Sequence, residues 1–197
     1  MAVNTLGLMS PGPDFVMCVK NSLTYSRKTG IYTAIGFSLG IIVHIAYCLA
    51  GLAIVISQSI LLFNIIKLLG AGYLIYIGIK SLTSDSANID IHADKKEDIS
   101  AFKAIKMGFL TNILNPKATM FFLGMFTLVI QPDTPALILA VASVLMVLST
   151  ALWFSLVALF LTQPRIQKVF EKIQGFVNKT FGALLVALGL KIALTKE

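Results

Sequence analysis

The chain has 197 residues, of which 57% are hydrophobic and only 13% are charged, and its mean hydropathy is +0.87. This composition excludes an ordinary soluble domain and indicates an integral membrane protein that lies in a lipid bilayer. The net charge of +7 does not indicate nucleic-acid binding, because the basic residues lie between apolar runs and form no single basic face.

Six charge-poor segments follow one another along the chain, and each is close to the length that a membrane-spanning helix needs. The sequence therefore predicts an all-α protein, a six-helix polytopic membrane protein whose single transmembrane domain covers residues 1–197. The six predicted spans are residues 1–19, 31–56, 60–82, 104–130, 135–161 and 175–194.

The first span contains the run Ser10-Pro11-Gly12-Pro13-Asp14. Two prolines around a glycine do not fit the interior of a regular helix, so we expect a break here, with released backbone carbonyls lining a cavity. Asp14 would then lie in the first turn of the next helix, where the helix dipole favours a negative charge. A carboxylate near the membrane surface explains Asp14 equally well, and both interpretations stay open.

The second span contains His44 near its centre. A histidine, with an unperturbed pKa of about 6.5, is a candidate proton carrier, although a hydrogen bond between helices is the simpler explanation. Gly36 and Gly40 form a Gly-x-x-x-Gly pair, which is typical of helices that pack closely in membranes.

Residues 83–103 form the only sizeable hydrophilic segment and predict a cytoplasmic linker, because they contain too few apolar side chains for a core. The linker separates a first repeat, residues 1–82, from a second repeat, residues 104–197. Each half contains three spans, an odd number, so the two halves would insert in opposite senses. The sequence thus predicts two inverted three-helix repeats, an arrangement typical of secondary transporters.

The fourth span contains the run Asn115-Pro116-Lys117 near its middle. Asparagine followed by proline is typical of the cap and first position of a helix, so helix 4 should be broken as helix 1 is. The new helix would direct free N–H groups, an anion-binding end, at the centre of the bilayer. Lys117 on this positive end needs an anionic partner. A simple packing kink is the alternative.

Most of the 16 Lys and Arg residues follow the first, third and fifth spans, whereas residues 57–59 and 131–134 contain none. Basic loops face the cytoplasm in membrane proteins. The sequence therefore predicts a cytoplasmic linker and places both termini outside.

Several stretches, including the Pro-Gly-Pro and Asn-Pro-Lys runs, resemble the LysE/RhtB family over nearly the whole chain. The resemblance implies a multi-pass protein of the bacterial inner membrane that exports amino acids or their derivatives by proton antiport. Members export different amino acids, so it does not name the substrate, and they carry several more residues ahead of the Pro-Gly-Pro run. The resembling stretches are residues 8–15, 70–74 and 108–117, with residues 153–194 resembling the homoserine/threonine branch.

For such a transporter, the two breaks would form one site for a zwitterionic amino acid. Free N–H groups and Lys117 would bind its carboxylate, and released carbonyls with Asp14 would bind its ammonium group. The residues assigned to the carboxylate side are Asn112, Asn115, Pro116 and Lys117, and those assigned to the ammonium side are Ser10, Pro11, Gly12, Pro13 and Asp14.

Asp14 is the only acidic residue within the predicted spans, so it is the obvious partner of Lys117. In the empty carrier Asp14 would pair with Lys117 or take up a proton. Protonation and substrate binding would then compete, as antiport requires, and His44 is the next candidate for the proton.

The sequence predicts no enzyme, no cofactor and no metal site; its predicted partners are an amino-acid substrate, protons, the lipid bilayer and, as one option, a second copy in a homodimer. Uptake by the same site is the nearest alternative, because gradients set the direction of transport. A DsbD-like electron carrier would need paired cysteines, but Cys18 and Cys48 lie at unrelated positions. An intramembrane hydrolase lacks a nucleophile with a nearby base, and a channel would need more polar rings.

Overall fold

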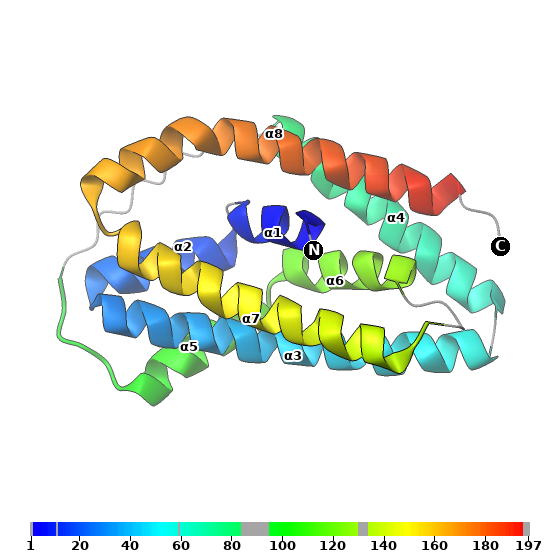
Figure 1. Ribbon diagram of the computed structural model, residues 1–197, viewed down its shortest axis with the longest axis horizontal. Helices are drawn as coiled ribbons and strands as arrows, with labels where there is room; N and C mark the ends of the chain where they lie inside the picture. The colour runs from blue at the N-terminus through cyan, green and yellow to red at the C-terminus, as the bar shows by residue number, and fades with distance from the viewer. Residues whose placement is uncertain (1, 11, 59, 84–94, 130–133, 195–197) are drawn as a thin grey trace.

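The computed structural model describes residues 2–10, 12–58, 60–83, 95–129 and 134–194, and within these ranges the chain forms eight α-helices and no strand. The all-α class predicted from the sequence is therefore confirmed. The helices lie roughly parallel in one elongated bundle (Figure 1). They are α1 (Ala2–Met9), α2 (Pro13–Thr24), α3 (Arg27–Gln58), α4 (Ile60–Thr83), α5 (Ala101–Ile113), α6 (Pro116–Val129), α7 (Ala136–Phe160) and α8 (Pro164–Leu194).

Four of the described helices are long and apolar enough to cross a membrane. The other two predicted spans each consist of two shorter helices, α1 with α2 and α5 with α6. The structure thus supplies four long helices and two broken pairs in place of six continuous ones. The four candidate spans are Arg27–Gly51, Asn64–Thr83, Ala136–Phe160 and Lys172–Leu194.

Both helix breaks lie at the prolines that predicted them. α2 begins at Pro13 with Gly12 as its extended N-cap residue. α6 begins at Pro116, and the Asn115 side-chain Oδ1 accepts a hydrogen bond of 3.0 Å from the Lys117 backbone N–H. A proline fits the first helical position because its missing N–H would have had no partner there. The predicted cap at Asn115 is confirmed.

Glycines allow two pairs of helices to approach closely. A side chain at Gly36 would meet the backbone of α5 at Phe109 N, 2.7 Å from the added carbon. On the other side of the bundle, a side chain at Gly78 would meet the carbonyl oxygen of Gly182 at 2.8 Å. These contacts join α3 to α5 and α4 to α8. Close backbone packing replaces the hydrophobic effect as the main source of helix association in lipid.

The outer surface of α7 is strongly apolar, as expected for a helix that faces lipid. Leu137, Leu148 and Leu152 are 75%, 59% and 63% exposed. In water such a surface would be an aggregation site, but in a bilayer it contacts hydrocarbon.

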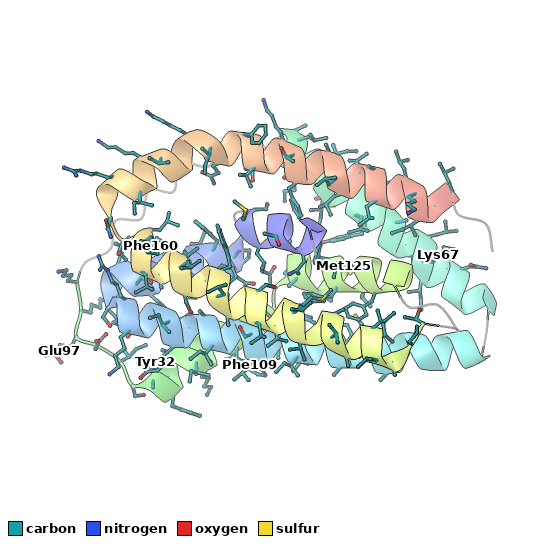
Figure 2. All side chains as sticks on the ribbon, viewed as in Figure 1. Tyr32, Lys67, Glu97, Phe109, Met125 and Phe160 are labelled. Carbon is teal, nitrogen blue, oxygen red and sulfur yellow. The ribbon has the colours of Figure 1, made fainter. Side chains whose placement is uncertain are left out.

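The turns from α2 to α3 and from α7 to α8 lie at one end of the bundle, which also carries Glu97 (Figures 1 and 2). This end, here called the basic end, is marked by exposed Arg27, Lys96 and Arg165. Lys67 lies near the opposite end (Figure 2). The basic segments predicted as loops therefore share one end of the molecule.

Part of the predicted linker is tied to this basic end. The Lys96 backbone N–H donates to the Thr24 carbonyl at 2.7 Å, and the Thr29 hydroxyl donates to Asp98 Oδ1 at 2.8 Å. Residues 84–94 lie outside the described residues. The described part of the linker therefore contacts the α2–α3 turn.

The last helix is longer than the predicted span 175–194, because α8 begins at Pro164. Its first turns contain Arg165, Lys168 and Lys172, which the hydropathy criterion assigned to a loop. Charged side chains exclude a segment from the hydrocarbon and not from a helix, so the helix continues beyond the apolar region.

Candidate functional site

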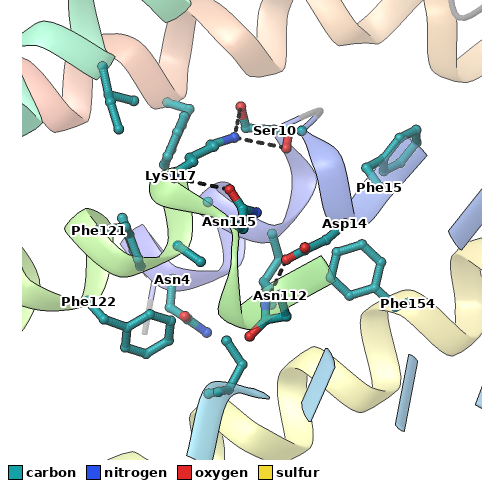
Figure 3. A pocket seen from close by; sticks show the side chains of 17 residues that line it. Asn4, Ser10, Asp14, Phe15, Asn112, Asn115, Lys117, Phe121, Phe122 and Phe154 are labelled. Carbon is teal, nitrogen blue, oxygen red and sulfur yellow. Dashed lines mark hydrogen bonds between the residues drawn. The ribbon is translucent and has the colours of Figure 1, made fainter. Parts of the chain in front are cut away.

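A cavity of about 60 Å³ lies between the two helix breaks (Figure 3). By this measure a single water molecule needs about 10–15 Å³, so the space admits a small polar solute in place of several waters. Its polar lining residues come from α1, α2 and the α5–α6 break. They are Asn4, Ser10, Asp14, Asn112, Asn115 and Lys117.

Lys117 in the first turn of α6 connects the two breaks. Its Nζ donates to the Ser10 carbonyl at 3.2 Å and to the Ser10 hydroxyl at 3.0 Å. The same ammonium lies 5.3 Å from the centre of the Phe181 ring. Ser10 follows the end of α1, so a carbonyl released at the first break receives the cation of the second.

Asp14 in the first turn of α2 uses only one of its carboxylate oxygens. Its Oδ2 accepts a hydrogen bond of 2.8 Å from Asn112 Nδ2. Its Oδ1 is buried and has no hydrogen-bond partner within the described part of the chain. Since Asp14 lines the cavity, this oxygen is an acceptor available to a ligand.

The pairing of Ser10 and Asn112 differs from the expected one. The sequence placed Asn112 with Lys117 and Ser10 with Asp14, whereas the structure bonds Asn112 to Asp14 and Ser10 to Lys117. The difference arises because the Asn112 side chain leaves α5 before its end and meets α2, a contact that spacing along one helix does not reveal.

The N-terminal end of α6 offers fewer free N–H groups than expected. Pro116 has no N–H, and the N–H of Lys117 donates to Asn115. Ala118 is the next residue of the helix, and it lines the cavity. Of these three positions, only Ala118 can offer a backbone donor to an anion.

His44 lies behind the wall of the cavity. Its Nε2 contacts the Asn112 carbonyl at 3.1 Å, so this nitrogen carries the hydrogen, and its Nδ1 lies 2.7 Å from the Tyr47 hydroxyl. Its ring stacks on Phe122, with centroids 5.6 Å apart. The structure therefore shows the interhelical hydrogen bond that was the simpler explanation of this histidine.

Gly40 on α3 leaves room for the Asn112 side chain. A carbon added at Gly40 would lie 2.9 Å from Asn112 Cβ and from Asn112 Cγ. Together with His44, this glycine fixes Asn112 in the position from which it donates to Asp14.

Gly40→Ala is expected to lower the unfolding free energy by about 1–3 kcal/mol, because overpacking forces Asn112 to move. For a chain of this size the melting temperature in detergent should fall by about 2–4 °C per kcal/mol. Gly72→Ala is the matched control, because an added carbon there meets no atom within 4 Å. Equal melting temperatures for the two variants would contradict the role of Gly40.

The structure adds lining residues that the sequence did not single out. Asn4 is buried and donates from Nδ2 to Ser149 Oγ at 3.1 Å. An asparagine within an apolar span is a signal that the analysis could have used. Aromatic walls had no such signal, because phenylalanines that line a cavity and those in a core look alike. The aromatic lining residues are Phe15, Phe121, Phe122, Phe154 and Phe181.

Three of the predicted site residues do not belong to the described lining. Pro13 and Pro116 start their helices and act by breaking the chain. His44 supports the wall, as described above. Gly12 does line the cavity. Pro11 lies outside the described residues.

The two cysteines lie apart in the core. Cys18 packs in the cluster around Phe15 and donates to the Phe154 carbonyl at 3.3 Å, whereas Cys48 belongs to the second cluster around Phe122. Both are buried free thiols. Nothing in this arrangement supports an electron carrier.

Comparison with known proteins gives a consistent result. Residues 5–196 match the sequence model of the family described as LysE type translocator. The uncharacterized membrane protein YrhP of Bacillus subtilis is 32% identical over 201 residues, which cover 94% of this chain and 92% of the relative. No solved structure matches the chain.

Two relatives have names that describe transport. The threonine efflux protein of Salmonella typhi is 28% identical, with 98% of this chain and 95% of the relative aligned. The homoserine/homoserine lactone efflux protein of Salmonella typhimurium is 29% identical, with 100% of this chain and 95% of the relative aligned.

Proposed function

The chain belongs to the LysE type translocator family, a family of transporters, and on this premise we propose that it exports threonine-like or homoserine-like amino acids from the bacterial cytoplasm. The observation that carries the proposal is the cavity between the two helix breaks, which has a cation on one side and a carboxylate on the other. An α-amino acid is the small solute that carries both opposite charges.

The substrate carboxylate binds at Lys117. It takes the place of the Ser10 oxygens that the ammonium contacts in this structure, and it gains the Ser10 hydroxyl and the Ala118 N–H as donors. Charge-assisted hydrogen bonds of this kind are stronger than neutral ones.

The substrate ammonium group binds at Asp14. The Oδ1 atom of this carboxylate accepts the ammonium, while Asn112 holds the Oδ2 atom in place. One site then recognises both charges of the zwitterion.

The remaining walls favour an uncharged side chain. Among the described lining residues, Asp14 and Lys117 are the only charged ones, and both are used by the backbone groups of the substrate. Phe121, Phe122 and Phe154 leave no charged partner for a lysine-like or glutamate-like side chain. The names of the threonine and homoserine relatives support the same class.

We assign the architecture to two inverted three-helix repeats, with α1 to α4 in the first and α5 to α8 in the second. Helices at equivalent places, α3 with α7 and α4 with α8, pack directly on each other. The basic end faces the cytoplasm by the positive-inside rule. Both breaks then meet at the cavity, where broken helices commonly bind substrate in secondary transporters.

Transport is coupled to protons by competition at Asp14. A proton and the substrate ammonium bind the same carboxylate oxygen, so each excludes the other. Exchange of one for the other across the membrane is antiport, and the proton gradient sets the direction as export.

The test uses inverted membrane vesicles, in which export is measured as accumulation of labelled amino acid. We expect saturable accumulation of threonine or homoserine at least about 10-fold faster than that of lysine or glutamate, since an unpaired buried charge costs more than 1.4 kcal/mol. An impermeant thiol reagent should label Glu97→Cys in these vesicles and not in intact cells. Equal rates for all four amino acids, or none above control vesicles, would reject the proposal.

A further inference from the structure

α8 carries two polar side chains that the cavity does not use. Gln174 and Asn178 are 0% and 3% exposed. Three of their atoms, Gln174 Nε2, Gln174 Oε1 and Asn178 Oδ1, are buried and have no hydrogen-bond partner in the structure as described. Buried polar atoms are nearly always hydrogen-bonded, so these amides require a partner from outside the chain.

The two amides lie on the face of α8 that leads to the cavity. Gln174 precedes Phe181 by two helical turns, and Asn178 lies between them, so all three side chains share one face. Phe181 lines the cavity beside Lys117. At about 1.5 Å per residue, Gln174 lies about 10 Å from Phe181 towards the basic end, where α8 begins (Figure 1).

The backbone beneath these amides is fixed. The Ser81 hydroxyl of α4 donates to the Asn178 carbonyl at 2.8 Å. One turn further along α8, Gly182 packs against the backbone of Gly78. The side chains are therefore presented by a rigid helix pair while their own hydrogen-bonding groups stay unpaired, as in a preorganised binding site.

We infer that Gln174 and Asn178 form a second subsite for the transported amino acid, between the cavity and the basic end. This inference rests on the proposed function. A carboxamide offers both donors and acceptors, so it can bind the carboxylate and the ammonium group of a zwitterion alike. It carries no charge, so it releases the solute more easily than Lys117 and Asp14 do. A solute that enters from the cytoplasm meets this subsite first.

The inference separates a transport role from a structural one by the sign of the stability change. Replacing an unpaired buried amide with leucine removes groups that destabilise the fold, so the protein should become more stable. A binding group that is lost at the same time should slow transport, the usual trade-off between stability and function. An amide that served only to hold the helices together would instead lower both.

The experiment compares Gln174→Leu and Asn178→Leu with wild type. We expect melting temperatures in detergent that are equal to wild type or higher by about 2–4 °C. In inverted vesicles the KM for labelled threonine or homoserine should rise at least fivefold. Gln163→Leu, which removes an exposed glutamine from the α7–α8 turn, should change neither quantity. Gln174→Asn keeps an amide and should restore part of the affinity.

A lower melting temperature for both leucine variants, or an unchanged KM in both, would overturn the subsite. These outcomes differ from failure of the proposed function. If wild type moved none of the amino acids tested, the proposed function would be rejected, while a melting temperature reduced in both leucine variants would still show that the amides are structural.

Discussion

Lys117→Ala is expected to reduce export at least about 30-fold, the factor that corresponds to 2 kcal/mol for the loss of one partner of a buried charged contact. The variant removes the group that binds the substrate carboxylate and leaves the Ser10 oxygens without their donor. The measurement is the initial rate in inverted vesicles, divided by the amount of carrier in the membrane. Carrier abundance should stay near wild type.

Two further variants define what the site requires of this lysine. Lys117→Arg should transport poorly, because a planar guanidinium is larger than an ammonium and the site beside Phe181 is confined. Lys106→Ala removes an exposed lysine of α5 and should leave the rate unchanged. Normal transport by Lys117→Ala would reduce the Asn115-Pro116 break to a packing kink.

Asp14→Asn is expected to separate exchange from proton coupling. An asparagine at this position can still accept a hydrogen bond from Asn112 and present a polar group to the cavity, but it cannot take up a proton. In proteoliposomes, exchange of labelled for unlabelled substrate should continue, whereas the response to an imposed pH gradient should disappear. The affinity for the substrate should fall, because a neutral amide binds an ammonium group more weakly than a carboxylate does.

The control for this variant is Glu97→Gln, which neutralises an exposed carboxylate at the basic end and should keep the pH-gradient response. A response to the gradient in Asp14→Asn that equals wild type would show that the proton travels through another group. His44 would then be the next residue to replace, since its ring contacts Asn112 beside the cavity.

The features that the sequence predicted well depend on neighbouring residues. The break at Asn115-Pro116 follows from a missing N–H and a capping side chain, and both act within one helical turn. The break before Pro13 has the same local origin. Such effects can be predicted without knowing how the helices pack.

The arrangement inside the cavity could not be predicted in the same way. The bond from Asn112 to Asp14 depends on how α5 lies against α2 and α3, and on the space that Gly40 leaves. Phe181 could not be distinguished from an ordinary core residue, because its role depends on Lys117 reaching across from another helix. Contacts between distant segments are set by packing, which one sequence alone does not specify.

The contacts of the linker with the α2–α3 turn bear on how the chain is assembled during synthesis. Thr24 and Thr29 belong to the first half, which leaves the ribosome first, and they hold residues 95–98 immediately ahead of α5. The newly made α5 therefore starts beside α3, with Gly108 close to Gly36. The earlier half serves as a template on which the later half docks, so the search for the correct partner is reduced to a short movement along α3.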